Sequence, residues 1–291
     1  MALSGSNDKQ RKYSAFGDVW RRLKKNKPAM AGLVIIVLLI LIAIFAPAIA
    51  PYSYSEQDSL HKFAPSGGEH LLGTDNLGRD VLSRLLYGSR QSLQMGLYSV
   101  AIAAVIGIVI GAIAGFYGGW LDNLLMRLLD IYQCIPMMLL CIVLAAALGP
   151  SLTNATVAIG VCSAPGYARL IRASILTIRE SEYVEAARAI DASDFRIITK
   201  HIIPNAIAPM IVQITMSIGG MILSGAMLTY IGLGAQPPIA EWGGMLADGR
   251  NFMRQHASQV IYPGVCIMIS VLSFNLLGDG LRDALDPRLK N

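Results

Sequence analysis

Charged side chains are missing from five long stretches of this 291-residue sequence, and they make up only 15% of it. A water-soluble chain of this length needs far more polar surface, whereas 54% of these residues are apolar. The uncharged stretches are 28–55, 91–121, 131–168, 201–240 and 255–278. Since one charge at the centre of a membrane helix costs about 2.5–3.5 kcal/mol, these gaps locate membrane spans and exclude a soluble globular protein.

The lengths of the gaps predict how many helices cross the membrane. A span needs about 20 residues, so the gap at 131–168 is long enough for two, separated at Gly149-Pro150-Ser151. We therefore expect an all-α integral membrane fold with six transmembrane helices, at about 31–50, 93–117, 124–148, 152–170, 205–228 and 259–277. The stretch from Gly232 to Pro238 is rich in Gly and Pro, and we expect irregular backbone there, at the outer face and packed in protein.

Lysine and arginine are distributed unevenly between the two sides of these spans. With the N-terminus inside, 18 of them lie in inner segments and 6 in outer segments, which predicts both termini in the cytoplasm. The expected organisation is a cytoplasmic N-terminal segment at 1–28 and a six-helix domain at 29–291. That domain would include an extracytoplasmic scaffold loop at 51–92, a cytoplasmic loop at 169–204 and a cytoplasmic tail at 278–291.

The N-terminal segment has an amphipathic pattern. Phe16, Trp20 and Leu23 follow one another at spacings of four and three, which predicts a helix within 13–27 that lies on the inner leaflet. A nucleic-acid patch is the alternative for the basic residues at 21–27, but an apolar span begins a few residues later. A cleaved signal peptide is a second alternative, disfavoured because the apolar run is about 20 residues long and lacks a convincing small-residue cleavage site.

The chain has few residues suited to catalysis or metal binding. Its four cysteines all fall in expected spans, and none are two or three residues apart as zinc ligands usually are. It has no HExxH and no GxSxG motif. A nickel site would require imidazoles, and His61, His70 and His256 lie on the outer side, but as scattered single residues. We therefore expect no catalytic residue, no metal and no cofactor in this chain.

Residues 183–193 form the most distinctive polar segment, between the expected fourth and fifth spans. They read Tyr-Val-Glu-Ala-Ala-Arg-Ala-Ile-Asp-Ala-Ser, and Ile203-Pro204-Asn205 follows. The pattern predicts a cytoplasmic helix-turn-helix, a shape suited to passing force between the membrane and a soluble partner. From the Glu-Ala-Ala triplet alone, an ordinary amphipathic helix is the alternative, because Glu and Ala are good helix formers.

This segment closely resembles the EAA loop of the membrane subunits of ABC importers. The outer stretch 70–80, the stretch 234–243 and the tail 278–288 resemble three further motifs of the dipeptide, oligopeptide and nickel branch of these permeases. The four motifs occur in the same order and cover the chain from about residue 20 to residue 290. The sequence is identified as a member of this permease family, and it resembles the second, C-type subunit of dipeptide permeases.

The resemblance implies the membrane subunit of an ATP-driven importer, with type I importer architecture and no catalysis of its own. The implied partners are a second homologous permease, two ATPase subunits that hold ATP and magnesium, an extracytoplasmic binding protein and the lipid of the bacterial inner membrane, with no nucleic acid. The residues implied to couple to the ATPase are Tyr183, Glu185, Ala186, Ala187, Asp191, Ala192 and Pro204.

Substrate and energy source remain open to alternatives at this point. The resemblance implies di- or oligopeptides as the solute, with nickel complexes or another small peptide-like solute as the alternative. A self-sufficient ion-coupled carrier is the rival class, but such carriers usually hold ionisable residues at mid-membrane, and the five gaps contain no acidic or basic residue other than histidine.

Two positions of the loop depart from the family pattern. The family Gly is Asp191 here, and the family Leu before Pro is Ile203. Glycine is usual where the backbone takes a positive φ, and Asp is one of the few other residues that enter that region at modest cost. We therefore predict a left-handed conformation for Asp191.

The second expected span carries small residues at every fourth position: Ala103, Gly107, Gly111 and Gly115. Such a stripe lets two helix backbones approach closely, so we expect this face to pack on a neighbouring helix, in this chain or in the partner permease. A phosphate-binding loop is the alternative, disfavoured because no Lys-Ser or Lys-Thr follows the glycines.

Three local expectations remain. Thr74 or Asp75 could cap the helix that continues to Ser92. Pro136 and Pro165 are expected to interrupt the third and fourth spans. Arg127 and Asp130 lie three residues apart near the inner end of the third span, a spacing that allows an ion pair.

Overall fold

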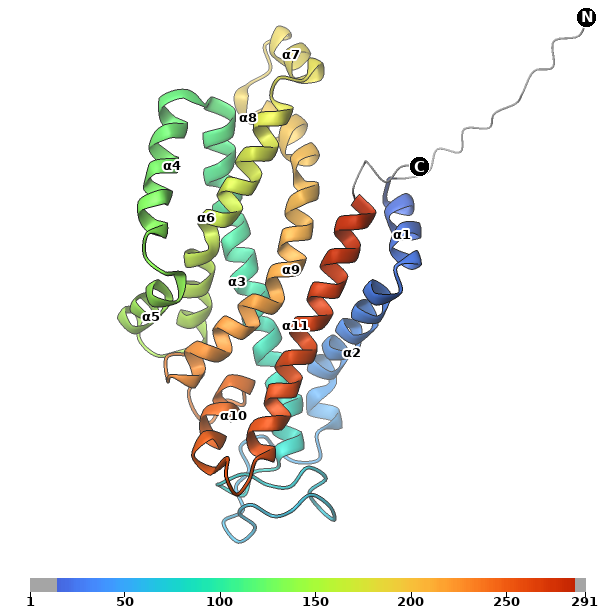
Figure 1. Cartoon of the computed structure of the whole chain (residues 1–291), viewed down its shortest axis with the longest axis vertical. Coiled ribbons are helices and arrows are strands. Elements are labelled where there is room, and N and C mark those ends of the chain that lie inside the picture. The colour runs from blue at the N-terminus through green and yellow to red at the C-terminus, as the bar shows by residue number, and fades with distance from the viewer. Residues whose placement is uncertain (1–14, 286–291) are drawn as a thin grey trace, which may run out of the picture.

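The computed structural model describes residues 15–285, and nearly all of its regular secondary structure is helical (Figure 1). Within these residues, β-type backbone pairing is limited to two isolated bridges, Gly67 with His70 and Thr74 with Asp80. The all-α expectation is therefore confirmed. Tyr13 of the expected amphipathic segment and Asp286-Pro287-Arg288 of the tail motif lie outside the described residues.

Four helical segments are long and apolar enough to cross a membrane. They are α2 (Lys27–Ile49), α3 (Val81–Tyr117), the segment Asp194–Tyr230 that includes α9 (Ile203–Tyr230), and α11 (Ser258–Leu285). The helices α4 (Gly119–Gln133) and α5 (Met137–Leu148) qualify only as a pair, and they are bent by 85° against each other. By length and composition, the described residues therefore form four or five spans.

The helix α6 (Leu152–Ile178) occupies the expected fourth span but is not among these apolar segments, so its role as a span stays a prediction. It packs along α3 more extensively than any other helix pair, and it also contacts α9 and α5. Ala158, Ile159 and Ile171 are fully buried. Because protein rather than lipid covers most of α6, its surface does not need the high hydropathy of a lipid-facing helix.

The glycine stripe of α3 contacts α6. A Cβ at Gly107 would lie 2.4 Å from Tyr167 Cβ, and one at Gly111 would lie 2.3 Å from the Ala168 carbonyl oxygen. At Gly115 the nearest side-chain atom would be Ile175 Cβ at 3.0 Å. The neighbour that the sequence left open is therefore a helix of the same chain, and the absence of side chains on this stripe sets the distance between α3 and α6.

The N-terminal helix α1 (Ala15–Lys25) packs against α11 and α2. Leu23 is buried in a small cluster with Ala29 and Ala284, whereas Trp20 is 38% exposed. Leu23 thus faces protein, so this residue of the expected membrane-facing stripe serves to hold α1 on the bundle.

Several boundaries differ from those expected. The predicted helix to Ser92 and the second span form one helix, α3, whose N-cap is Asp80 rather than Thr74 or Asp75. The Asp80 carboxylate accepts a hydrogen bond from the Ser83 N–H at 2.7 Å. Thr74 instead contributes its hydroxyl to the loop, where it accepts from the Ala64 N–H at 2.8 Å.

The third expected span, 124–148, is interrupted at Pro136, as predicted. The helix α4 ends at Gln133, and Pro136, which has no N–H, stands directly before α5. Pro165, by contrast, lies inside the uninterrupted α6. The expected pairing of Arg127 with Asp130 is wrong, because Asp130 accepts a hydrogen bond from Arg169 Nη2 at 2.7 Å across to α6.

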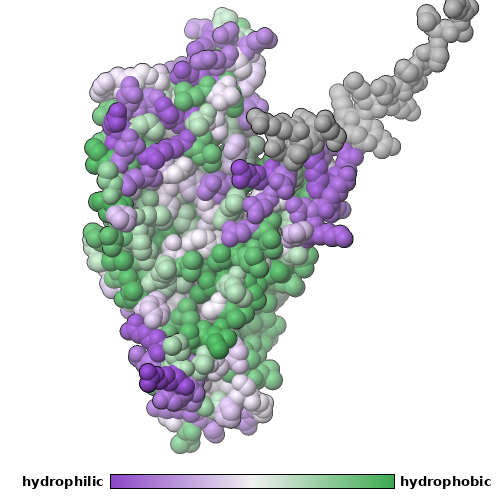
Figure 2. Space-filling model, in the orientation of Figure 1, coloured by the Kyte–Doolittle hydropathy of each residue, from purple (hydrophilic) through white to green (hydrophobic). Residues whose placement is uncertain are grey.

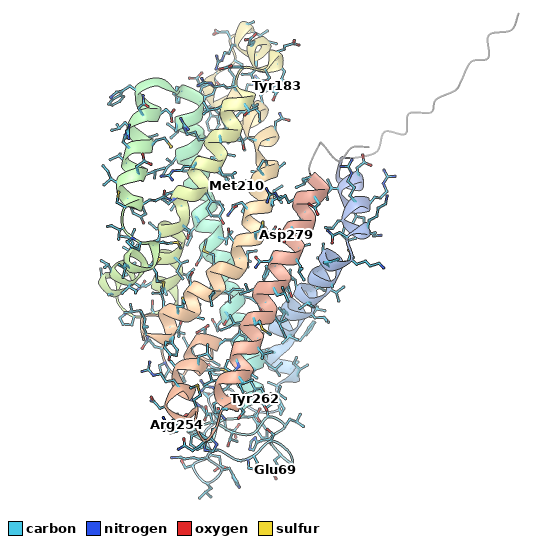
Figure 3. All side chains as sticks on the ribbon, viewed as in Figure 1. Glu69, Tyr183, Met210, Arg254, Tyr262 and Asp279 are labelled. Atoms are coloured by element: carbon cyan, nitrogen blue, oxygen red, sulfur yellow. The ribbon has the colours of Figure 1, made fainter. Side chains whose placement is uncertain are left out.

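The motifs at 70–80 and 234–243 are brought together at the end of the bundle where Glu69 and Arg254 lie (Figure 3). Trp242 begins α10 (Trp242–Gly249), is 1% exposed and donates its indole N–H to the Leu85 carbonyl at 3.1 Å. The buried Glu241 carboxylate accepts from Ser92 Oγ at 2.9 Å. The irregular segment from Gly232 to Pro238 leads into α10, as expected.

Hydrophilic side chains gather at both ends of the molecule and around α1, whereas hydrophobic ones cover much of the visible middle, over α2 and α11 (Figure 2). This banded surface is the one expected of a chain whose two ends lie in water and whose middle lies in lipid.

Candidate functional site

The polar loop after α6 forms one tip of the molecule. It contains α7 (Glu182–Ala189), α8 (Asp194–Ile197) and the π-turn η1 (Ile198–Ile202). The helix α7, which carries Tyr183, projects beyond the ends of the long helices, and Glu69 lies at the opposite end (Figures 1 and 3). The loop is therefore the part of this end that is most accessible to a soluble partner.

One face of α7 anchors it to the bundle. Val184 is fully buried and Ala187 is 5% exposed. Both belong to the main buried cluster, which also contains Phe116 from α3, Ile175 from α6 and Ile197 from α8. The three-residue spacing of Val184 and Ala187 places them on the same side of a helix. The anchor fixes which side of α7 faces outward.

Asp191 ends α7 with a left-handed residue, as predicted. Its φ is +59°, and its N–H donates to the Arg188 carbonyl at 2.9 Å. The Ala192 N–H reaches back to the Ala187 carbonyl at 3.1 Å. These two bonds make a Schellman motif with Asp191 in the position usually held by Gly. The turn that the family motif implies therefore forms here despite the missing glycine.

The outward face of α7 and the following turn carries exposed charge and exposed apolar surface. Glu185, Ala186 and Arg188 are exposed, and Tyr183 is 44% exposed. Acidic residues occupy the first turn of α7 and Arg188 its last turn, which suits the helix dipole.

Two apolar residues beside α7 were not singled out from the sequence. Ile190 is 80% exposed and Phe195 is 77% exposed. Large apolar side chains grouped at a polar surface mark interaction sites. The available signal was their apolar character inside a polar loop, at positions that the Glu-Ala-Ala triplet does not include.

A cleft of about 560 Å³ lies between the loop and the ends of α3 and α6. Phe116, Arg179, Arg188 and Asp194 are among its lining residues. The Arg188 guanidinium lies 5.5 Å from the centroid of the Phe116 ring, and Arg179 Nη1 donates to the Gly115 carbonyl at 3.3 Å. Cations from the loop and from α6 thus bind the end of α3.

The loop continues into α9 without a break in helical structure. At the π-turn the Ile203 N–H donates to the Ile198 carbonyl, five residues earlier. Pro204 follows in the first turn of α9, where its missing N–H is tolerated after such a turn. The Asn205 side-chain amide donates to the His201 carbonyl at 2.7 Å. A displacement of α8 is therefore transmitted directly to α9.

Two ion pairs join α4 to α6, the helix that leads into the loop. Arg172 binds both carboxylate oxygens of Asp122, with Nε at 2.5 Å and Nη2 at 2.6 Å. Asp122 is 9% exposed, so the carboxylate of this bidentate pair is largely buried, whereas the Arg172 side chain is partly exposed. With the pair of Asp130 and Arg169, this bidentate pair couples the position of α4 to that of α6.

The three histidines considered for a nickel site do not converge. His61 Nδ1 lies 2.6 Å from Asp58 Oδ2, and His70 Nδ1 lies 2.9 Å from Asp80 Oδ1. His256 stacks on Phe63, with ring centroids 4.0 Å apart. Among residues 15–285, no group of three or more His, Cys, Asp or Glu side chains is placed to hold a metal ion.

Comparisons with known proteins agree with the family resemblance. Residues 107–291 match the family described as binding-protein-dependent transport system inner membrane component, and residues 14–65 match the N-terminal TM domain of oligopeptide transport permease C. The dipeptide transport system permease protein DppC of Alkalihalophilus pseudofirmus is 46% identical over 284 residues, which cover 98% of this chain and 93% of the relative. The glutathione transport system permease protein GsiD of Escherichia coli is 45% identical over 276 residues, which cover 94% and 90%.

A solved structure shows the same fold at lower identity. A chain of the inward-facing MetNI methionine ABC transporter superposes with a TM-score of 0.57 at 22% identity, over 70% of this chain and 97% of that chain. The family match spans more than half of the sequence, and the relatives align with nearly all of it. The chain therefore belongs to the binding-protein-dependent transport system inner membrane components, the membrane-embedded permeases of ABC importers.

Proposed function

We propose that this chain is the C-type membrane subunit of an ATP-driven importer of short peptides, and that α7 is its docking element for the ATPase. The proposal rests on how α7 is anchored, how it ends and what surface it leaves exposed. Val184 and Ala187 anchor the helix, a left-handed Asp191 ends it, and Ile190 and Phe195 leave apolar surface exposed beside it. ATP and magnesium belong to the ATPase subunits in this proposal, and this chain performs no hydrolysis.

The proposed mechanism moves the spans through α7. When two ATPase subunits close on ATP, they displace α7, which residues 179–181 join to α6 and residues 190–193 join to α8, η1 and α9. The ion pairs of Asp122 and Asp130 carry the motion of α6 to α4. The spans then alternate between outward and inward openings around a solute that a binding protein delivers from outside.

The proposed topology has six spans in the bacterial inner membrane, with both termini in the cytoplasm and the α7 loop on the same side. The 18 to 6 bias of Lys and Arg supports this orientation. The count of six takes the pair of α4 and α5 as one span and adds α6, the fourth span along the chain. The helix α6 is 27 residues long and mostly enclosed by α3, α9 and α5. A second homologous permease completes the membrane domain, and α1 lies at the inner leaflet.

Short peptides are the proposed solutes because the relatives are named as permeases for dipeptides, for di- and tripeptides and for glutathione. Nickel complexes are the alternative within the same machinery. His61, His70 and His256 each have separate partners, which favours peptides. Uptake by vesicles that persists without ATP or the ATPase would contradict the proposal and favour an ion-coupled carrier.

The docking role predicts a separation of hydrolysis from transport. Replacing Glu185 by Lys reverses a charge on the exposed face of α7 and leaves the anchor intact. We expect ATP hydrolysis by the reconstituted complex to continue while peptide uptake is lost. Glu69→Lys makes the same charge change on an exposed residue at the opposite end and serves as the control. Normal uptake by Glu185→Lys would contradict the role of α7.

A second experiment measures docking itself. Phe195→Ser removes the exposed ring beside α7, and we expect at least a tenfold loss in the amount of ATPase that co-purifies with the permease. Leu60→Ser is the matched control, because Leu60 is 91% exposed in the outer loop. Equal retention of the ATPase by both variants would show that this surface is not the docking site.

A further inference from the structure

A second site lies within the bundle and is open on one side. It is a groove of about 700 Å³ between the α4–α5 break, α6 and α9. Its polar lining residues are Tyr132, Gln133, Ser163, Tyr167, Gln213, Ser217 and Ser224. No charged side chain is among the described residues that line it. The groove therefore offers hydrogen bonds and apolar surface without a fixed charge.

Two hydroxyl groups in this groove lack a hydrogen bond of good geometry. The oxygens of Tyr132 and Tyr167 are shielded from solvent; Cys162 and Ser217 are their polar neighbours, but neither contact is a well-formed hydrogen bond, and Tyr167 as a whole is only 2% exposed. Buried polar groups nearly always find a partner, because an unsatisfied one is costly. Nearby, Gln213 Nε2 donates to Ser217 Oγ at 3.0 Å, so the amide oxygen of Gln213 is free to accept. The groove thus presents hydroxyl and amide groups that a ligand can satisfy.

Glycines keep the groove open. A Cβ at Gly166 on α6 or at Gly220 on α9 would meet no atom within 4 Å, although both residues line the groove. The glycines of the α3 stripe are different, since a Cβ there would collide with α6. Gly166 and Gly220 are therefore not needed for packing inside this chain, and their missing side chains leave room for an occupant.

The shielded tyrosine hydroxyls favour a short peptide, rather than a helix of a partner subunit, as the occupant of the groove. A membrane helix satisfies its own backbone N–H and C=O groups internally, so an apolar helix of a partner would offer the hydroxyls of Tyr132 and Tyr167 no free donor or acceptor. A short peptide in transit brings amide groups that are not bonded internally. The surface area of the lining is mainly apolar with a substantial polar share, the composition usual for sites that bind small solutes.

We propose that this groove is a transit site in which Tyr132, Tyr167 and Gln213 bind the amide groups of a peptide during translocation. The inference rests on the proposed import of peptides and names the residues that would contact them. Recognition at this site depends on hydrogen bonding and size. Because no lining residue is charged, we expect the groove not to select peptides by the charge of their side chains.

Filling the groove tests its occupancy. Gly220→Ala and Gly220→Leu add graded bulk where the structure has space, and Gly264→Leu adds the same bulk at a glycine of α11 that also has nothing within 4 Å and lies outside the groove. Uptake of dialanine and of diphenylalanine is measured in proteoliposomes that hold the complete complex. We expect Gly220→Leu to lower diphenylalanine uptake at least tenfold and dialanine uptake less, with Gly264→Leu like wild type.

Removing the hydroxyls tests recognition. Tyr167→Phe and Tyr132→Phe keep the ring, and we expect each to raise the KM for dialanine by roughly three- to tenfold, the value of one hydrogen bond. Tyr98→Phe, at a 55% exposed position of α3, is the control and should keep the wild-type KM.

The outcomes separate this proposal from the import function itself. If the wild-type complex takes up neither peptide with ATP, the proposed function fails. If wild type imports peptides but the Gly220 and tyrosine variants match it, the transit site is wrong. If Gly220→Leu instead releases the second permease from the complex and affects both peptides equally, the groove is an interface between permeases and the proposal is overturned.

Discussion

The close contact of α3 with α6 predicts a large effect from one added methyl group. In Gly111→Ala, the new Cβ would lie 2.2 Å from Ile171 Cγ2 and 2.3 Å from the Ala168 carbonyl oxygen. Overpacking costs about 1–3 kcal/mol, while Ala gains about 0.5–1 kcal/mol over Gly from helix propensity. Because a backbone carbonyl cannot rotate away, the cost lies at the upper end, and we expect a net loss of about 2 kcal/mol.

The assay compares thermal stability across three glycines of the same complex in detergent. Gly111→Ala should melt lowest, Gly115→Ala should be intermediate because its closest contact would be 3.0 Å, and Gly264→Ala should equal or exceed wild type. At about 2–4 °C per kcal/mol for a domain of moderate size, the difference between the first and last variants is easily measured. A Gly111→Ala complex as stable as wild type would refute the account of how α3 packs on α6.

Three further outcomes follow from local geometry. Asp191→Gly should stabilise the loop by about 1 kcal/mol and Asp191→Val should destabilise it, as measured by protease cleavage within 179–197, because φ is +59° there; equal cleavage would contradict this. Glu241→Ala should cost about 1–3 kcal/mol, seen as earlier melting than for a Glu69→Ala control, because Ser92 Oγ and the Gly244 N–H both donate to the buried Glu241 carboxylate. The hydrogen bond between Asp58 and His61 raises the pKa of His61 above 6.5 and lowers the pKa of Asp58 below 3.8. The pair therefore stabilises the fold between pH 3.8 and pH 6.5. This stabilisation is lost as pH rises through the raised pKa of His61 or falls through the lowered pKa of Asp58. NMR titration of labelled histidine should show the His61 pKa falling in Asp58→Asn, and an unchanged value would disprove the pairing.

The gaps in charge located the helices but did not show which of them are sharply bent or enclosed by protein. Lipid contact demands a continuous apolar surface, which is why the spans in α2, α3, α9 and α11 appear at the expected places. The helix α6 contacts protein on most sides, so hydropathy alone does not identify it. The interruption at Pro136 was predicted, but the 85° angle between α4 and α5 was not, because a proline shows where a helix is interrupted and not the direction in which the chain continues.

In the α7 loop, the backbone conformation of single residues was predictable from the sequence, whereas contacts between the loop and other helices were not. A left-handed residue at Asp191 followed from its place in the motif, since few residue types enter that region. The exposed Ile190 and Phe195, and the Arg188 contact with Phe116, depend on how α7 lies across the ends of α3 and α6. Likewise, the groove with Tyr132 and Tyr167 joins residues of separate helices, so one sequence could not identify its lining.

The uninterrupted length of α3 has a mechanical consequence. Its 37 residues span about 55 Å, well beyond the roughly 30 Å of hydrocarbon, so one stiff helix joins the end of the bundle at Val81 to the cleft at Phe116 and Tyr117 beside the α7 loop. Tilting such a rod by about 5° shifts its far tip by about 5 Å, a full helical pitch. A displacement at the Val81 end of α3 can thereby move the residues that contact the α7 loop, and a displacement of that loop can move the opposite end through the same helix.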